Sequence, residues 1–191
     1  MTRPEDVLET WFEGEPGTYR ERWFKLDLAF DEALRQRLGP AAEAALRGEL
    51  EDWAETPKGA LALCILLDQL PRNLHRGTAR AFAADPLARA VARRAVLGRA
   101  QDLALTEVER IFLYLPFEHS EDQTDQDLSV ALFEGLRDDP LHARPGGTVD
   151  YAWRHWRIIR RFGRFPHRNA ALGRPTTSEE AAFLQQPGSS F

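Results

Sequence analysis

Apolar residues recur at helical spacing in almost every segment of this chain. Leu26, Phe30, Leu34 and Leu38 follow one another four residues apart, which places them on one face of a helix. No segment has the alternation of apolar and polar residues, rich in β-branched side chains, that half-buried strands require. The sequence therefore predicts an all-α fold.

Capping and breaking residues divide the chain into about eight helices. Thr56 followed by Pro57 opens a helix whose residues 59–67 are apolar on all sides, as in a helix surrounded by others. We expect an earlier helix to end at Gly39–Pro40 and a later one to end before Pro116, because proline has no N–H for the helical hydrogen bonds. The other expected helices include a short one around residues 7–12, 41 to about 53, 85–98, 121–136 after Ser120, 148–162 before Gly163, and a short one after Thr177.

The links between these helices are short, and none has the composition of a linker between domains. We therefore expect a single domain over residues 1–184, with residues 185–191 as a frayed tail. The pattern alone leaves open whether the helices stack as a solenoid or pack as a bundle.

Composition restricts the class of partner. The 191 residues carry 30 acids and 25 bases, a net charge of −5, which argues against a nucleic-acid or membrane-surface partner. The longest uncharged apolar run is nine residues, residues 59–67, too short to span a bilayer. Cys64 is the only cysteine, which excludes an internal disulfide and a cysteine-based zinc site. We expect a soluble, cytoplasmic protein, and because no nucleotide, cofactor or metal motif occurs, no cofactor or metal site is predicted.

The central apolar helix ends in a polar cluster. A carboxylate at the end of an apolar helix opposes the helix dipole and loses hydration, so Asp68 needs a cation, and Arg72 is four residues away. One interpretation is a structural Asp68–Arg72 pair. The other is a ligand pocket lined by Asp68, Gln69, Arg72 and Asn73.

A second cluster combines a histidine with carboxylates. Glu118 and His119 follow an apolar stretch directly, and Glu121, Asp122 and Asp125 come next. Acids in the first turn of a helix are common, but Glu118 and His119 precede that turn. The candidates for catalysis are His119, Glu118 and Asp122, which could act as an acid–base pair or hold a metal ion; a buried structural imidazole is the alternative.

A third cluster is basic. The stretch from Tyr151 to Thr177 has seven arginines and no acid. After its helix comes a segment with Arg164, His167, Arg168 and Asn169, which resembles the segment ending at Asn73 in that a proline is followed by Arg-Asn at a helix exit. These four residues are the further ligand-binding candidates. Pairing between this stretch and the five acids at 118, 121, 122, 125 and 127 is the simplest alternative. His155 falls on the apolar face of its helix and is expected at the edge of the core.

Four motifs carry a family resemblance: residues 66–73, 76–86, 113–122 and 164–169. With them the sequence resembles the bacterial domain-of-unknown-function 924 family over almost its whole length. The resemblance implies a compact, tetratricopeptide-like helical-repeat array, and it implies neither an activity nor catalytic residues.

Three hypotheses for function follow. The first is a binding module that holds an anionic small molecule or peptide terminus in a central pocket of arginine, histidine and acidic residues. The second is a hydrolase or lyase that uses His119 with a carboxylate, with or without a metal ion. The third is a structural protein, such as a homodimer, in which the charged motifs form one buried ion network.

Overall fold

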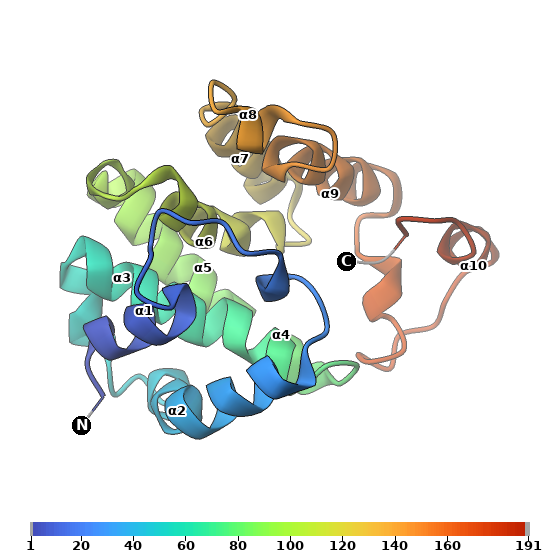
Figure 1. Cartoon of the computed structure of the whole chain (residues 1–191). Helices are drawn as coiled ribbons and strands as arrows, with labels where there is room; N and C mark the ends of the chain where they lie inside the picture. Colours follow the sequence, from blue (N-terminus) through green and yellow to red (C-terminus); the bar gives the residue numbers. More distant parts are fainter. Residues whose placement is uncertain (1, 190–191) are drawn as a thin grey trace. The chain divides into compact units, whose positions relative to one another are not determined.

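Ten α-helical segments and several shorter 3₁₀ and π turns make up the computed structural model, which describes residues 2–189 (Figure 1). Eight of the ten helices have seven residues or more, and no strand occurs within residues 2–189. The prediction of an all-α fold with about eight helices is therefore confirmed. No helix in the described part of the chain is both long and apolar enough to cross a membrane.

The chain folds as two compact units. Unit 1 comprises the residues up to 76 and residues 80–116, and unit 2 comprises residues 77–79 and those from 117 onward. A single domain over residues 1–184 and a helical-repeat array stay predictions.

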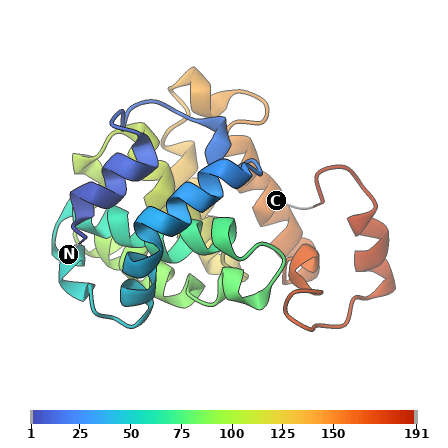
Figure 2. The same ribbon diagram turned by 60° about the horizontal axis from the view of Figure 1, so that its bottom comes forward.

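Unit 1 contains α3 together with the helices that precede and follow it in the chain. Its helices are α1 (Pro4–Phe12), α2 (Leu28–Leu46), α3 (Pro57–Cys64), α4 (Leu70–Leu74), α5 (Asp85–Arg93) and α6 (Glu107–Glu118), whose last two residues belong to unit 2. Figure 2 shows α1 and α2, in blue, beside each other, and α3 packs against α1 and α5.

The apolar segment after Thr56 forms the buried centre of unit 1. The Thr56 hydroxyl accepts a hydrogen bond from Gly59 N (3.1 Å), so this residue caps α3 as the sequence predicts. All residues from Gly59 to Cys64 are buried. The helical path does not end at Asp68. It passes through a π-helical turn, Ile65–Gln69, and continues as α4. Pro71 has no N–H to donate one turn back, which favours such a change in hydrogen bonding.

Aromatic side chains join α1, α6 and the segment between α1 and α2. The indoles of Trp11 and Trp23 stack with ring centroids 6.2 Å apart, and Phe112 meets both rings edge-on. The Trp23 indole N–H donates to the carbonyl of Trp11 (3.0 Å). Both indole rings are therefore packed against other aromatic rings, and the indole N–H of Trp23 also has a hydrogen-bond partner. These contacts fix the path of the chain between α1 and α2.

Two proline positions correct the predicted helix ends. The helix α2 runs through Pro40 to Leu46, and α6 runs through Pro116 to Glu118. Ala41 and Ala45 are buried and continue the apolar face that begins at Leu34 and Leu38. Packing of this continuous face outweighs the one backbone hydrogen bond that proline removes.

Unit 2 has its own core. Its helices are α7 (Gln123–Glu134), α8 (Pro140–Ala143), α9 (Thr148–Phe162) and α10 (Ser178–Leu184). The helix α9 packs along α7 and against α8 (Figure 1). Ile158, Ile159 and Phe165 form a buried cluster, against which Phe162 and Phe183 pack. Gly163 ends α9 with a φ of 66°, a conformation that glycine adopts at little cost.

Local sequence signals predict the N-terminus of α10 correctly and that of α7 only approximately. Thr177 and Glu180 form the predicted capping box of α10. The helix α7 starts later than predicted, because Asp122 rather than Ser120 is its N-cap and accepts from Thr124 N and Asp125 N. In the expected tail, residues 190 and 191 lie outside the described residues, while Ser189 is buried and donates to the carbonyl of Leu184.

Candidate functional site

Gln69 and Arg72, which lie in and just after the π-helical turn, contact carboxylates of unit 1. Arg72 donates to both oxygens of Asp85 (2.9 and 3.0 Å) and lies 3.2 Å from a carboxylate oxygen of Asp68, which is 0% exposed. The Gln69 amide also donates to Asp68. The structural Asp68–Arg72 pair is therefore present, with Asp85 as a third member that lies 13 residues beyond Arg72.

Asn73 belongs to a second network on the side of α2. Its amide donates to Asp31 (2.7 Å), and Arg76 donates to the same carboxylate at 3.1–3.2 Å. Asp31 and Asn73 are both buried. The hydrogen bonds of these side chains are made with other groups of the chain. A role in ligand binding therefore stays a prediction for Asp68, Gln69, Arg72 and Asn73.

A cavity of about 210 Å³ lies beside the same segment, between α2 and α4. Its apolar lining comprises Leu46, Leu66, Leu67, Leu70, Pro71, Leu74 and the alanines at 42, 83 and 84. Leu66, Leu67 and Leu70 are less than 4% exposed and form the floor. The motif around the π-helical turn thus faces the cavity with its leucines, whereas its polar side chains point into the two networks.

Charged residues line the same cavity. They are Arg35, Glu43, His75 and Arg80. Arg80 forms an ion pair with Glu43, and Arg35 donates to the carbonyl of Leu74 (3.1 Å). Burial and the charges of Arg80 and Arg35 lower the pKa of His75, so the imidazole is neutral at pH 7. Two guanidinium groups and one carboxylate therefore stand beside an apolar floor.

In unit 2, the segment after α9 is fixed by Glu121. The backbone N–H of Phe165 donates to Glu121 (2.8 Å), and Arg174 donates to both oxygens of the same carboxylate (2.7 and 3.0 Å). Burial raises the pKa of Glu121, but the hydrogen bonds from Arg174 and Phe165 outweigh burial and lower it overall. The acidic and the basic motif of this unit therefore meet, as the pairing alternative proposes for Glu121.

Arg164 and Asn169 pair with the last helix. Arg164 donates to both oxygens of Glu180 (2.6 and 2.9 Å), and the Asn169 amide donates to Glu180 and to Thr176 at 3.3 Å. Glu180 is 2% exposed. No sequence pattern identifies Glu180 as this partner, because the acid belongs to the capping box of α10.

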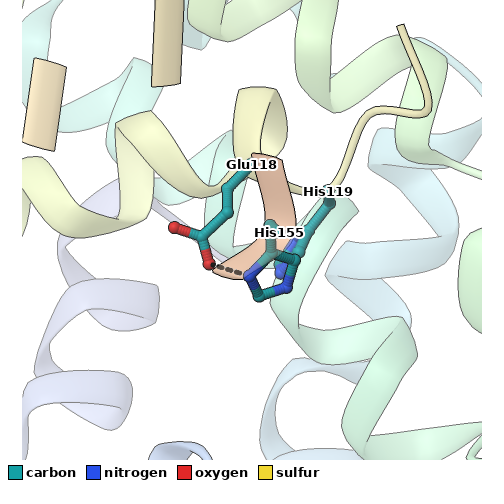
Figure 3. Close-up of side chains that lie close together, drawn as sticks. All are labelled: Glu118, His119 and His155. Atoms are coloured by element: carbon teal, nitrogen blue, oxygen red, sulfur yellow. Dashed lines mark ion pairs between the residues drawn. The ribbon is translucent and has the colours of Figure 1, made fainter. Parts of the chain in front are cut away.

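The catalytic candidates Glu118 and His119 lie beside His155 of α9 (Figure 3). A carboxylate oxygen of Glu118 is 3.2 Å from Nδ1 of His155, and one ligating atom of each of the three residues lies within 4.8 Å of the other two. Glu118 and His155 are 3% exposed, and His119 is half-buried. Asp122 instead caps α7.

Phe165 connects this cluster to the motif after α9. Its ring lies 5.4 Å from the His155 ring and 5.7 Å from that of His167, and the Arg168 guanidinium lies over it at 4.4 Å. Burial, with the charges of His119, Arg168 and His167, lowers the pKa of His155 well below its usual value. His155 is therefore a neutral imidazole at pH 7. Helical spacing predicts its burial, but no local signal identifies Glu118 as its partner.

Comparison with known proteins gives a family but no activity. The profile of the family described as "Bacterial protein of unknown function (DUF924)" matches residues 7–188. The chain is similar to the solved structure of ATU0120 from Agrobacterium tumefaciens, a protein of unknown function, with 41% identity and a TM-score of 0.85 over 95% of this chain and 96% of that one. None of the curated proteins matches. The four sequence motifs and these matches agree, and the chain belongs to the DUF924 family of bacterial proteins.

Proposed function

We propose that this protein is a binding module for small anionic molecules, and that the cavity of unit 1 takes a carboxylate with a short apolar chain. The observation that carries the proposal is the combination, in one cavity, of a leucine floor with the guanidinium groups of Arg35 and Arg80. Apolar pockets with a few converging polar groups are the usual form of small-molecule sites.

The size of the cavity favours a small ligand. At about 210 Å³ it is smaller than the roughly 300–1,000 Å³ of sites for drug-sized molecules, so a short-chain acid fits better than a peptide. The π-helical turn at Ile65–Gln69 supports this location, because π turns inside α-helices are frequent at functional sites.

The charges favour an anion. Arg80 is 56% exposed on its side chain and already holds one carboxylate, that of Glu43. A ligand carboxylate would replace Glu43 as the partner of Arg80 while its chain packs on Leu66, Leu67 and Leu70. The neutral imidazole of His75 would supply a further hydrogen bond without adding charge.

Titration calorimetry of the full chain with hexanoate tests the proposal, with 1-hexanol and hexylamine as ligands of the same chain length. We expect hexanoate to bind and the other two to bind more weakly or not at all. Arg80→Gln should weaken hexanoate binding by about 10- to 100-fold, the value of a hydrogen bond to a charged group. Glu43→Gln should strengthen it, because it removes the competing carboxylate.

Two further variants make the result specific to the cavity. Ala83→Leu adds a side chain to the exposed part of the lining and should abolish binding. Arg47→Gln is the matched control, because Arg47 forms a similarly exposed pair with Glu49 and does not line the cavity. The proposal is wrong if hexanoate does not bind, or if it binds equally well to the wild type, the Arg80→Gln variant and the Ala83→Leu variant.

A further inference from the structure

The imidazole of His75 lines the cavity of unit 1 and belongs to the one side-chain type that ordinarily changes its charge near neutral pH. His75 follows the last residue of α4, where its backbone N–H donates to the carbonyl of Pro71 (2.9 Å). Its side chain is half-buried, so it is in contact with both the cavity and solvent. A change in its charge would therefore be felt by a ligand in the cavity.

The charges around His75 favour its neutral form. Arg35 and Glu43 come from α2, and Arg80 comes from the 3₁₀ turn Ala79–Phe82. Burial, and then the charges of Arg80 and Arg35, lower the pKa of His75 from 6.5, whereas Glu43 acts in the opposite direction. An additional negative charge beside these groups would shift this balance toward the imidazolium.

The other acids on the elements that pack against α4 have cationic partners. These elements are α2 and the π-helical turn, Ile65–Gln69. The pairs are Asp31 with Arg76, Glu32 with Arg35, and Asp68 with Arg72. The π-helical turn presents the apolar side chains of Leu66 and Leu67 to the cavity. The anion that enters the cavity is therefore the new charge to which His75 responds.

We infer that His75 couples anion binding in this cavity to the uptake of a proton, so that the protein holds its ligand more tightly at mildly acidic than at alkaline pH. The inference rests on the binding function proposed above and adds to it a residue that senses pH. An opposite charge at contact distance stabilises the imidazolium. Because the ring is half-buried, it keeps part of its hydration in the complex.

The direction of the pH dependence follows from linkage. At alkaline pH the imidazole is neutral in both states, and it donates one hydrogen bond to the ligand. As the pH falls through the pKa of His75 in the complex, the complex takes up a proton that the free protein does not hold, and the affinity rises. The gain is complete below the pKa of His75 in the free protein, which lies under 6.5.

Titration calorimetry of the full chain with hexanoate at about pH 6 and about pH 8.5 tests the inference. Hexanoate is ionised at both values, because carboxyl groups in water titrate near about pH 4. We expect about 3- to 10-fold tighter binding at the lower pH, since a pKa change of one unit corresponds to about tenfold. Titrations near neutral pH in two buffers that differ in their enthalpy of ionisation should show the uptake of a fraction of one proton.

Two variants at the same position separate charge from shape. His75→Gln keeps a hydrogen-bond donor but cannot take up a proton, so its affinity should be equal at the two pH values and close to that of the wild type at the higher one. His75→Lys carries a permanent charge, so its affinity should be high at both values. A cation is also tolerated at the C-terminal end of α4. Circular dichroism confirms that both variants are folded.

The possible failures can be told apart. If the wild type binds hexanoate equally well at both pH values and takes up no proton, the inference is wrong while the proposed function stands. The inference is also wrong if the folded His75→Gln variant keeps the pH dependence of the wild type. If the wild type does not bind hexanoate at either pH, the proposed function fails and the inference fails with it.

Discussion

The guanidinium of Arg164 and the carboxylate of Glu180 face each other through two contacts, 2.6 Å from Nε to Oε1 and 2.9 Å from Nη2 to Oε2. The same carboxylate accepts from the backbone N–H of Thr177 (2.8 Å). One acid therefore caps α10 and attaches it to the segment after α9. This double use makes Glu180 the residue on which the last helix depends most.

Glu180→Gln should release α10 from unit 2. We expect the amides of residues 178–184 to exchange with solvent roughly tenfold faster or more, because charge-assisted bidentate contacts are the strong ones. Hydrogen-exchange mass spectrometry measures this. Glu179→Gln is the neighbouring control, because Glu179 pairs with Arg161 while remaining 64% exposed on its side chain, and exchange should be unchanged.

Glu180 should also make α10 acid-sensitive. Its hydrogen bonds to Arg164, and then to Thr177 N, lower its pKa from 4.5 to about 2. Because the folded-state pKa is depressed, the stabilisation is complete above about pH 4.5 and is lost as the pH falls through 2. A carboxyl ¹³C NMR titration should give a midpoint of about 2 for Glu180. A midpoint near 4.5 would contradict the contact, and Arg164→Gln should move the midpoint upward.

Arg72→Lys should destabilise unit 1 although the charge is kept. Lysine cannot contact both oxygens of Asp85 and also approach buried Asp68, so we expect a loss of about 1–3 kcal/mol in the free energy of unfolding. Arg72→Gln should cost more, about 3–5 kcal/mol, because it leaves a buried carboxylate without its cation. Urea denaturation followed by circular dichroism measures both, and Arg47→Lys, at an exposed pair, should change the value by less than about 0.5 kcal/mol.

Gly59→Ala should be strongly destabilising, because α3 approaches the preceding segment closely at this residue. An added Cβ would lie 2.0 Å from the carbonyl oxygen of Trp53, a backbone atom. We expect a loss of about 3 kcal/mol or failure to fold. Gly17→Ala is the contrasting change, because Gly17 does not have a left-handed φ and, apart from its chain neighbours, nothing lies within 4 Å of its Cβ position, so the free energy of unfolding should change by less than about 0.5 kcal/mol. Equal thermal midpoints for the two variants would refute the packing argument.

Cys64 should report the opening of unit 1. The thiol is 0% exposed, and burial, with the charge of Asp68, raises its pKa well above the usual value. We expect no reaction with a disulfide reagent at pH 8 in the native state and one equivalent after denaturation. Since Cys64 is the only cysteine, the rate of labelling in dilute urea measures unfolding directly. Rapid labelling of the native protein would show that α3 is not the closed centre of this unit.

Local signals predict much of the helical framework. The caps at Thr56 and Thr177 and the glycine at Gly163 are placed correctly, because each depends on residues within one turn. The ends expected at Pro40 and Pro116 are wrong, because tertiary burial of a continuous apolar face decides whether a helix tolerates proline.

The partners of the charged residues could not be predicted in the same way. Arg72 is four residues from Asp68, and this short spacing identifies the pair. Two other pairs, Arg164 with Glu180 and Glu118 with His155, join residues that are far apart in the sequence. The number and spacing of charged residues do not predict which distant segments of the chain come together. His155 shows the difference most clearly, because helical periodicity predicts its burial but not the carboxylate and the second imidazole beside it.

The π-helical turn Ile65–Gln69 has a consequence for how this segment tolerates insertions and deletions. A π turn accommodates about one residue more than an α turn, so every side chain after it is rotated by about 100° relative to an uninterrupted α-helix. This rotation determines that Leu70 and Leu74 face the cavity while Arg72 and Asn73 face Asp85 and Asp31. Loss of one residue here would turn both sets of side chains by about 100° away from their present partners, so the length of this segment is constrained as well as its chemistry.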